Sequence, residues 1–402
     1  MGGSGSKIKV EEKKVVVVGG GIAGVEVAKK LATKGVRVTL ISKDDYIVIL
    51  PMILKAYVDS SVPQKGIRPL SSIFNGKKYA SVDVIQGLVV EVETEKKQTI
   101  LADGKTVEYD ILIIATGCAF NFPNAVSLNF DEAPTSGNHQ NTAISTFKSV
   151  YESVKRAKTV AVIGGGPVGL ETAGEIAGAY PEISVHLFHS GSAVLDNLKV
   201  SLKPKTIRKL ESQLNGMVNV HCNTRVDLKS VHSTIADEDR KNMPKSILDR
   251  VGQNNPFALK TDKGETIDAD MVFVCVGHLP IEDRPSLWNS DFFQSNASKE
   301  HPGRLQIDSN MRVKGARNIF ALGDCAYLEE NQMAYYAAKM HTPVVVKNVV
   351  DVIQGKEPSK TYSAQTKAAM IIPLGPKKGV TEMEGKVFGA FMTQKFAGMK
   401  SS

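Results

Sequence analysis

The sequence is poor in cysteine and in aromatic residues. It has four cysteines in 402 residues, and aromatic side chains make up 6% of the chain, with one tryptophan. The cysteines, at Cys118, Cys222, Cys275 and Cys325, are too far apart for a CxxC or CxxxxC pair, which excludes a dithiol relay. Without a cluster of His and Cys residues no metal site is expected. We therefore expect reduced, largely buried thiols in a reducing compartment.

The chain also lacks long apolar runs. No stretch approaches the roughly 18 apolar residues needed to span a bilayer, and the N-terminal residues lack the apolar core of a secretory signal, so secretion is not expected. The formal net charge is +8, and residues 366–402 hold six lysines against two glutamates. Such a bias fits an anionic membrane surface as well as an ordinary solvated surface. No nucleic-acid-binding motif accompanies it.

Two glycine-rich motifs are the most informative feature of the chain. They are Gly19-Gly20-Gly21-Ile22-Ala23-Gly24 and Gly164-Gly165-Gly166-Pro167-Val168-Gly169, each following a β-branched run and preceding a helical pattern. In such motifs the first glycine permits a tight turn, the second lets a pyrophosphate approach, and the third lets the helix pack on the sheet. The helix N-terminus then presents N–H groups to the phosphates. Two motifs predict two dinucleotides with electron transfer between them.

The apolar pattern predicts an α/β fold of two nested Rossmann-like domains and a small C-terminal α+β segment. Residues 15–41 have the pattern of a strand, a helix and a second strand, and another such unit starts at Thr159. From Ala368 a strand and a final helix are expected. A small antiparallel excursion is expected at residues 82–86, 88–93 and 98–101.

The residues after the second strand of each unit depart from the usual pattern. An acidic residue normally stands there and binds the ribose hydroxyls of adenosine. The first unit has Ser42 and Lys43, and the second has His189 and Ser190. Ser42 bonds a hydroxyl more weakly than a carboxylate would, and His189 is equally compatible with a polar strand end. The second unit has neither an acid to repel a 2′-phosphate nor a nearby arginine to bind one, so the sequence permits NADH or NADPH.

Further segments resemble motifs of two-dinucleotide flavoproteins. Ala115-Thr116-Gly117 resembles their ATG motif, and Ile319–Asp324 resembles the late motif whose Asp bonds the ribitol chain of FAD. Leu50-Pro51-Met52 resembles the segment that lies against the isoalloxazine in apoptosis-inducing-factor-like enzymes. Over residues 14–396 the chain resembles the ferroptosis suppressor proteins and, beyond them, the type II NADH dehydrogenases.

The resemblance implies which residues contact the cofactors. FAD is expected at the first motif and NAD(P)H at the second, with Glu171 at the nicotinamide end. Glu171 also suits the first turn of a helix, and Asp324 also suits a helix N-cap. The implied catalytic residues are Glu171 and Pro51. The implied cofactor-binding residues are Gly19, Gly20, Gly21, Ile22, Ala23, Gly24, Ser42, Lys43, Lys55, Val89, Ala115, Thr116, Gly117, Gly164, Gly166, Gly169, Gly277, Gly323, Asp324 and Ala334.

The nested arrangement follows because the late motif serves the same cofactor as the first motif. The chain is expected to leave its first domain, build a second and return. The expected parts are a flexible N-terminus at 1–10, an FAD-binding domain at 11–145 and 276–365, an NAD(P)H-binding domain at 146–275 and a C-terminal segment at 366–402.

The resemblance further implies an FAD-dependent NAD(P)H:quinone oxidoreductase. Electrons would pass from NAD(P)H through the flavin to a ubiquinone-like acceptor, because no dithiol is available to take them. The apolar residues Ile47, Ile49, Leu50 and Met52 suit a planar quinone and equally suit a protein core. A redox-sensing signalling flavoprotein and a reductase of a protein partner remain open as alternatives, and so does the oligomeric state.

Membrane contact is the remaining expectation. The segment Met1–Ser6 matches a myristoylation pattern, and the same letters equally match an engineered Gly/Ser linker. Apolar residues near the C-terminus have helical spacing, which is typical of a core-facing helix and also of a membrane-facing one; they are Val387, Phe388, Phe391, Met392 and Phe396. The expected location is the cytoplasmic face of a membrane, such as a lipid droplet, the plasma membrane or the mitochondrial outer membrane.

Overall fold

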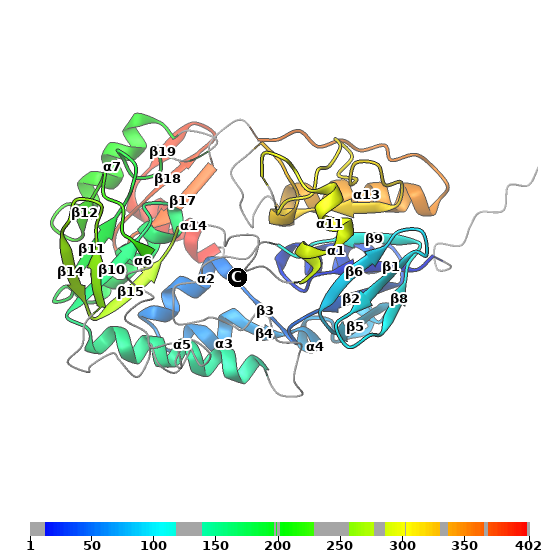
Figure 1. Ribbon diagram of the computed structural model, residues 1–402, viewed down its shortest axis with the longest axis horizontal. Coiled ribbons are helices and arrows are strands. Elements are labelled where there is room, and N and C mark those ends of the chain that lie inside the picture. Colours follow the sequence, from blue (N-terminus) through cyan, green and yellow to red (C-terminus); the bar gives the residue numbers. More distant parts are fainter. Residues whose placement is uncertain are drawn as a thin grey trace, which may run out of the picture.

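The computed structural model describes residues 13–117, 139–196, 198, 202–228, 257–276, 286–301, 303–329, 337–365 and 369–399. Figure 1 shows two groups of parallel strands in separate halves of the molecule, each with helices packed around it. The β-branched side chains of the central strands fill both faces of each sheet, as parallel sheets require.

The first parallel sheet has the strand order β16-β9-β1-β2-β5. The late strand β16 pairs in parallel with β9, so a segment near residue 320 returns to the sheet that the N-terminal strand began. Helix α1 packs against α13, and both contribute to the hydrophobic cluster beside this sheet. The elements are β1 (Val15–Val18), α1 (Ile22–Ala32), β2 (Val38–Ser42), α4 (Leu70–Ile73), η3 (Lys77–Tyr79), β5 (Val82–Gln86), β9 (Ile111–Ile114), β16 (Ile319–Ala321), η6 (Gly323–Cys325), η7 (Ala337–His341) and α13 (Thr342–Ile353).

The expectation that residues 82–86 join an antiparallel excursion is wrong. They form β5, which pairs in parallel with β2 and places Ile85 opposite Ile41. β5 is an edge strand with partly exposed side chains, so it lacks the continuous apolar pattern of a buried parallel strand. The antiparallel sheet consists instead of β6 (Val89–Glu93), β7 (Gln98–Leu101) and β8 (Thr106–Glu108), and it packs against η5 (Ser286–Asn289) and α11 (Asp291–Asn296).

The second parallel sheet has the strand order β12-β11-β10-β15. An antiparallel hairpin, β13 and β14, contributes to the cluster on one face, and α5, α6 and α7 contribute to the cluster on the other. The elements are α5 (His139–Arg156), β10 (Thr159–Ile163), α6 (Pro167–Ala179), β11 (Ser184–Phe188), α7 (Pro204–Leu214), β12 (Asn219–His221), β13 (Phe257–Lys260), β14 (Thr266–Ala269) and β15 (Met271–Val274).

The segment between β2 and α4 joins the two halves. Within it, η2 packs on α5 and α6 of the second half. Tyr46, Ile53 and Tyr57 of this segment belong to the same hydrophobic cluster as Phe147 and Phe273. The elements of the segment are β3 (Tyr46–Val48), α2 (Leu50–Ile53), η2 (Leu54–Tyr57), α3 (Val62–Gly66) and β4 (Ile67–Pro69).

The C-terminal segment is an antiparallel sheet followed by a helix, β17 (Ala369–Pro373), β18 (Gly379–Met383), β19 (Lys386–Phe388) and α14 (Ala390–Met399). It therefore has three strands where one was expected. Val387 and Phe388 lie in β19, so the expected apolar stripe is not the face of one helix. Among the described residues, no helix combines the length and the apolar composition that a membrane span requires.

Candidate functional site

The first glycine loop has the geometry of a phosphate cradle. Gly19 has φ +117°, and a Cβ atom added there would lie 2.3 Å from the carbonyl oxygen of Ala115. A Cβ atom at Gly24 would lie 1.9 Å from the oxygen of Gly19, so α1 approaches the loop as only glycine allows. At Gly21 an added Cβ atom meets nothing within 4 Å, and no side chain caps the helix that begins at Ile22. The helix N-terminus is thus open on the side where a pyrophosphate would bind.

The second glycine loop repeats this geometry. Gly164 has φ +116°, and an added Cβ atom would lie 2.3 Å from the carbonyl oxygen of Cys275. At Gly169 it would lie 1.8 Å from the oxygen of Gly164, and at Gly166 it meets nothing within 4 Å. Helix α6 also begins without a side-chain cap. Two open cradles of the same design fit two dinucleotide pyrophosphates.

The ATG-like and late motifs meet the first cradle. Ala115 directly follows β9 and supplies the oxygen beside Gly19, while Thr116 and Gly117 continue from it. An added Cβ atom at Gly323 would lie 3.3 Å from the Cβ atom of Ala23, so the late motif lies against the first turn of α1 and brings Asp324 to this end of the sheet. Contact of these residues with FAD remains a prediction.

The strand-end residue of the first unit is sequestered under the loop. Ser42 is 5% exposed, and its hydroxyl donates to the carbonyl oxygen of Asp44 at 2.8 Å. Because that proton is in use, Ser42 can only accept a hydrogen bond from a ribose hydroxyl. Lys43 follows it, and its carbonyl oxygen accepts from Gln86. Val89 is buried in β6, where it pairs with Leu101.

Glu171 and Glu175 lie one turn apart on α6. Glu171 is partly exposed and lies beyond the first turn of the helix, which corrects its interpretation as a first-turn residue. Glu175 is 4% exposed, and its Oε1 atom has no hydrogen-bond partner within the described ranges of the chain. Burial raises the pKa of Glu175, while Lys55 and the backbone amide of Gly375 act in the opposite direction.

Lys55 thus lies at the boundary of the two halves. It is partly buried in η2, and its charge acts on Glu175 of α6 and on Asp59 of its own segment. The expected contact of Lys55 with FAD stays a prediction, and no prediction from the sequence included Glu175. The available signal was a second carboxylate, four residues after Glu171, on a helix otherwise made mainly of small and apolar residues.

The segment that resembles a flavin-facing one is divided between core and surface. Ile47 is 7% exposed and belongs to the core, whereas Ile49, Leu50 and Met52 are partly exposed. Pro51 lies in α2, at the second position of the helix. Gly277 and Ala334, both expected to bind a cofactor, lie outside the described residues.

The three cysteines within the described ranges are free thiols, and Cys118 lies outside these ranges. Cys325 is buried as a whole residue, whereas Cys222 and Cys275 are partly exposed as residues although the Cys275 thiol group itself is desolvated. Burial raises the pKa of Cys275 to about 12 and of Cys325 to about 11, which leaves both thiols protonated at neutral pH. No group of three metal-ligating side chains occurs in the described ranges.

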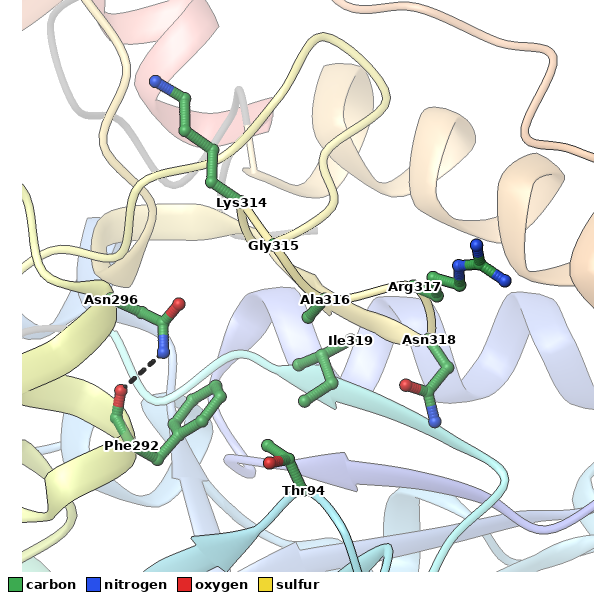
Figure 2. A pocket seen from close by; sticks show the side chains of 9 residues that line it. All are labelled: Thr94, Phe292, Asn296, Lys314, Gly315, Ala316, Arg317, Asn318 and Ile319. Atoms are coloured by element: carbon green, nitrogen blue, oxygen red, sulfur yellow. Dashed lines mark hydrogen bonds between the residues drawn. The ribbon is translucent and has the colours of Figure 1, made fainter.

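A separate pocket of about 300 Å³ lies at the opposite ends of the strands, beside the start of β16 (Figure 2). The two side-chain amides that line it already form hydrogen bonds. Asn296 donates to the carbonyl oxygen of Phe292 at 2.8 Å, and Asn318 donates to the carbonyl oxygen of Asp110 at 2.7 Å. Figure 2 shows the side chains of Lys314 and Arg317 extending in different directions. Because parallel sheets bind ligands at the carboxyl ends of their strands, this pocket is not the candidate site.

Comparisons with known proteins agree with this fold. The chain is 30% identical to ferroptosis suppressor protein 1 of Xenopus tropicalis, covering 96% of this chain and 93% of that protein. It is 27% identical to apoptosis-inducing factor homolog B of Dictyostelium discoideum, with the same coverage. Among solved structures, the sulfide:quinone oxidoreductase of Aquifex aeolicus superimposes with a TM-score of 0.70 at 17% identity, covering 97% of this chain and 90% of that one.

A family model described as pyridine nucleotide-disulphide oxidoreductase matches residues 13–342. The match contains both glycine loops, the ATG-like motif and the late motif. The chain therefore belongs to the pyridine nucleotide-disulphide oxidoreductase family, as a member whose sequence has no CxxxxC pair.

Proposed function

We propose that this protein is an FAD-dependent NAD(P)H:quinone oxidoreductase that works at a membrane surface. The observation that carries the proposal is the pair of matching cradles at Gly21 and Gly166, each open beside an uncapped helix N-terminus. Similarity to ferroptosis suppressor protein 1 and to a sulfide:quinone oxidoreductase supports it. The absence of a CxxxxC pair from the sequence supports direct transfer from the flavin to an external acceptor.

The proposal assigns one cofactor to each cradle. FAD binds the domain made of residues 11–145 and 276–365, through the loop Gly19–Gly24, the ATG-like motif and Asp324. NAD(P)H binds residues 146–275, through the loop Gly164–Gly169 and Glu171. When bound, FAD accepts a hydride from NAD(P)H and passes two electrons to the acceptor. The protein contributes orientation, because both loops are rigid turns between a buried strand and a helix.

Glu175 and Lys55 are placed to hold protons at the boundary of the two halves. Reduction of a quinone takes up protons as well as electrons, so a proton-holding group near the acceptor is useful. The raised pKa of Glu175 means that it keeps its proton at a higher pH than an exposed glutamate. Lys55, whose charge acts on Glu175, can stabilise the carboxylate once the proton has left.

The C-terminal segment supplies a surface suited to an anionic membrane. Phe391 is 81% exposed. It lines a shallow hollow of about 510 Å³ together with Lys377 and Lys395, which are both exposed. An exposed aromatic side chain between cations is the combination that binds the interface of anionic bilayers.

This membrane proposal is tested by sedimentation with vesicles. We expect binding to phosphatidylserine vesicles, weaker binding at high salt, and loss of binding in the variant F391S with K377E and K395E. The matched control is K96E with K105E, which reverses two exposed lysines on the β6–β8 sheet. Equal loss in both variants would assign the effect to net charge alone and refute the patch.

The proposed activity is tested by anaerobic stopped-flow absorbance. The FAD-loaded protein is reduced with NADH or NADPH and then mixed with a short-chain ubiquinone. We expect bleaching of the flavin absorbance, followed by rapid recovery driven by the quinone. Similarity to an apoptosis-inducing factor homolog makes a signalling flavoprotein the second candidate. A persistent long-wavelength band with slow recovery would favour that candidate, and a protein that binds no flavin would refute both.

A further inference from the structure

The two glycine loops differ in the side chain that lies beneath them. A Cβ atom added at Gly20 would lie 2.2 Å from the hydroxyl oxygen of Ser42, the last residue of β2. At the matching position Gly165 it would lie 2.7 Å from Cγ of His189, the first residue after β11. The imidazole ring of His189 therefore takes the place of the Ser42 hydroxyl group, and it is the larger side chain of the two.

His189 connects the glycine loop to a carboxylate. Its Nδ1 atom accepts a hydrogen bond from the backbone amide of Gly165 at 3.2 Å. Its Nε2 atom lies 2.9 Å from Oδ1 of Asp196. Because Nδ1 accepts, this pattern assigns the proton to Nε2, which donates to the carboxylate. The imidazole is 8% exposed and the Asp196 side chain 32%, so a buried ring holds a carboxylate that reaches solvent.

The chain after β11 folds back to the same loop. The amide of Leu195 donates to the carbonyl oxygen of Gly165 at 3.0 Å. An added Cβ atom at Gly191 would lie 2.1 Å from Oδ2 of Asp196, so glycine is required there for the carboxylate to lie against the turn. The glycine loop, the strand end and Asp196 thus form one hydrogen-bonded unit.

The carboxylate is ionised in this setting. Partial burial opposes ionisation, but the hydrogen bonds from His189 and from the amides of Ala193 and Ser192 lower the pKa of Asp196 overall. In dinucleotide-binding sheets an acid at the end of the second strand bonds the 2′-hydroxyl of the adenosine ribose and repels a 2′-phosphate. The position directly after β11 has no acid, but a carboxylate reaches it from seven residues further along the chain.

We infer that Asp196, positioned by His189, recognises the adenosine ribose of NADH and makes the second cradle discriminate against NADPH. The inference rests on the proposed function, since it concerns the nucleotide at the Gly164–Gly169 loop. A cation also lies near this strand end, because Lys263 donates to the hydroxyl of Thr224 at 2.8 Å and the Thr224 amide bonds the carbonyl oxygen of His189. Without the negative charge of Asp196, the positive charge of Lys263 would favour the binding of a 2′-phosphate.

The test uses nucleotide fragments that carry no nicotinamide, so it does not depend on turnover. Dissociation constants of ADP-ribose and of 2′-phospho-ADP-ribose are measured by calorimetry on the FAD-loaded protein. We expect ADP-ribose to bind at least about tenfold more tightly to the unmodified protein, since a charge-assisted hydrogen bond is exchanged for charge repulsion.

The variant D196N separates recognition from support of the fold. Asparagine keeps an oxygen that accepts from His189 but carries no charge, so the ratio of the two dissociation constants is expected to fall below about threefold. The control E211Q removes an exposed charge from α7 of the same half, and it is expected to leave the ratio unchanged.

Three results would overturn the inference. Equal affinities of the unmodified protein for the two fragments would refute it without any variant, and an unchanged ratio in D196N would show that Asp196 only supports the loop. In both cases the proposed function stands, because a fragment still binds. Failure of both fragments to bind would refute the inference and also the proposed NAD(P)H site.

Discussion

At the residue scale, the glycines of each loop have two different functions. Gly24 and Gly169 are needed because an added Cβ atom would overlap a backbone oxygen of the loop. Gly21 and Gly166 face open space, and their backbone angles, with φ −76° in both, are accessible to alanine. The fold itself therefore does not require glycine at these two positions, and we predict that the requirement comes from the bound nucleotide.

This difference predicts opposite results for two alanine substitutions in the second loop. G166A is expected to keep the melting temperature and the bound FAD, while the Kd for NADH rises by about tenfold or more because the methyl group occupies the phosphate site. G169A is expected to lower the melting temperature by several degrees, because backbone must move. Calorimetry and thermal unfolding distinguish the two. A G166A variant that binds NADH normally would contradict the assignment of the cradle.

Glu175 provides a pH-dependent prediction. Its pKa is raised in the folded protein, so the stability it contributes is present below the pKa of the unfolded chain and is lost as the pH rises toward the folded value. In E175Q the side chain stays neutral, so folding carries no free-energy cost of ionising a buried carboxyl group. Its melting temperature relative to the unmodified protein is therefore expected to rise as the pH increases above the ordinary pKa of a glutamate.

The control for E175Q is E152Q on α5. Glu152 is an exposed glutamate, with 53% of its side chain accessible. The difference between E152Q and the unmodified protein is expected to stay small over the same pH range. A difference for E175Q that is constant with pH would show that Glu175 is not held against ionisation by burial.

At the element scale, helix α6 is the centre of the site. Its N-terminus forms the second cradle, its middle carries Glu171 and Glu175, and β17 of the C-terminal segment packs against it. The last contact is a close backbone approach, because a Cβ atom at Gly174 would lie 2.6 Å from Cα of Leu374. The C-terminal segment is therefore held beside Glu175, whose carboxylate accepts from the amide of Gly375.

This contact predicts that G174A displaces the C-terminal segment. The added methyl group would lie 2.6 Å from the Cα atom of Leu374, an overlap with backbone that a side-chain rotation cannot relieve. Limited proteolysis is expected to cleave residues 369–399 faster in G174A, whereas G166A, in which an added Cβ atom meets nothing within 4 Å, is expected to match the unmodified protein. Equal cleavage of G174A and G166A would show that the contact does not hold the segment.

At the scale of the whole molecule, Tyr57 joins the two halves. It is fully buried in η2, and its ring packs with Phe147 of α5 and Phe273 of β15 at centroid distances of 6.3 and 5.0 Å. Its hydroxyl oxygen is buried without a hydrogen-bond partner among the residues that the structure describes. The ring therefore stabilises the boundary between the two halves, whereas the unpaired buried hydroxyl lowers the free energy of unfolding.

We expect Y57F to increase the free energy of unfolding by about 1 kcal/mol, because an unsatisfied buried hydroxyl is removed. Y57A is expected to lower it by about 3–5 kcal/mol through loss of the ring and creation of a cavity. Denaturant unfolding measures both changes. A Y57F variant less stable than the unmodified protein would indicate that the hydroxyl has a partner at this boundary.

The sequence by itself determined the two cradles and the class of fold. Glycine spacing after β-branched runs reports local backbone geometry, and that geometry depends on neighbours within one strand, turn and helix. For this reason the positions Gly19–Gly24 and Gly164–Gly169 could be predicted, together with the ATG-like and late motifs. The bounds of the domains remain a prediction, although β16 does return to the first sheet.

Only the tertiary structure decided which distant side chains meet. Lys55 faces Glu175 because η2 packs on α6, and Asp196 reaches the end of β11 because the loop from Gly191 turns back on the glycine loop. The placement of residues 82–86 in the parallel sheet was likewise settled by pairing with β2 and not by composition. Pairing, burial and charge contact depend on residues far apart along the chain, and a local sequence pattern carries no record of them.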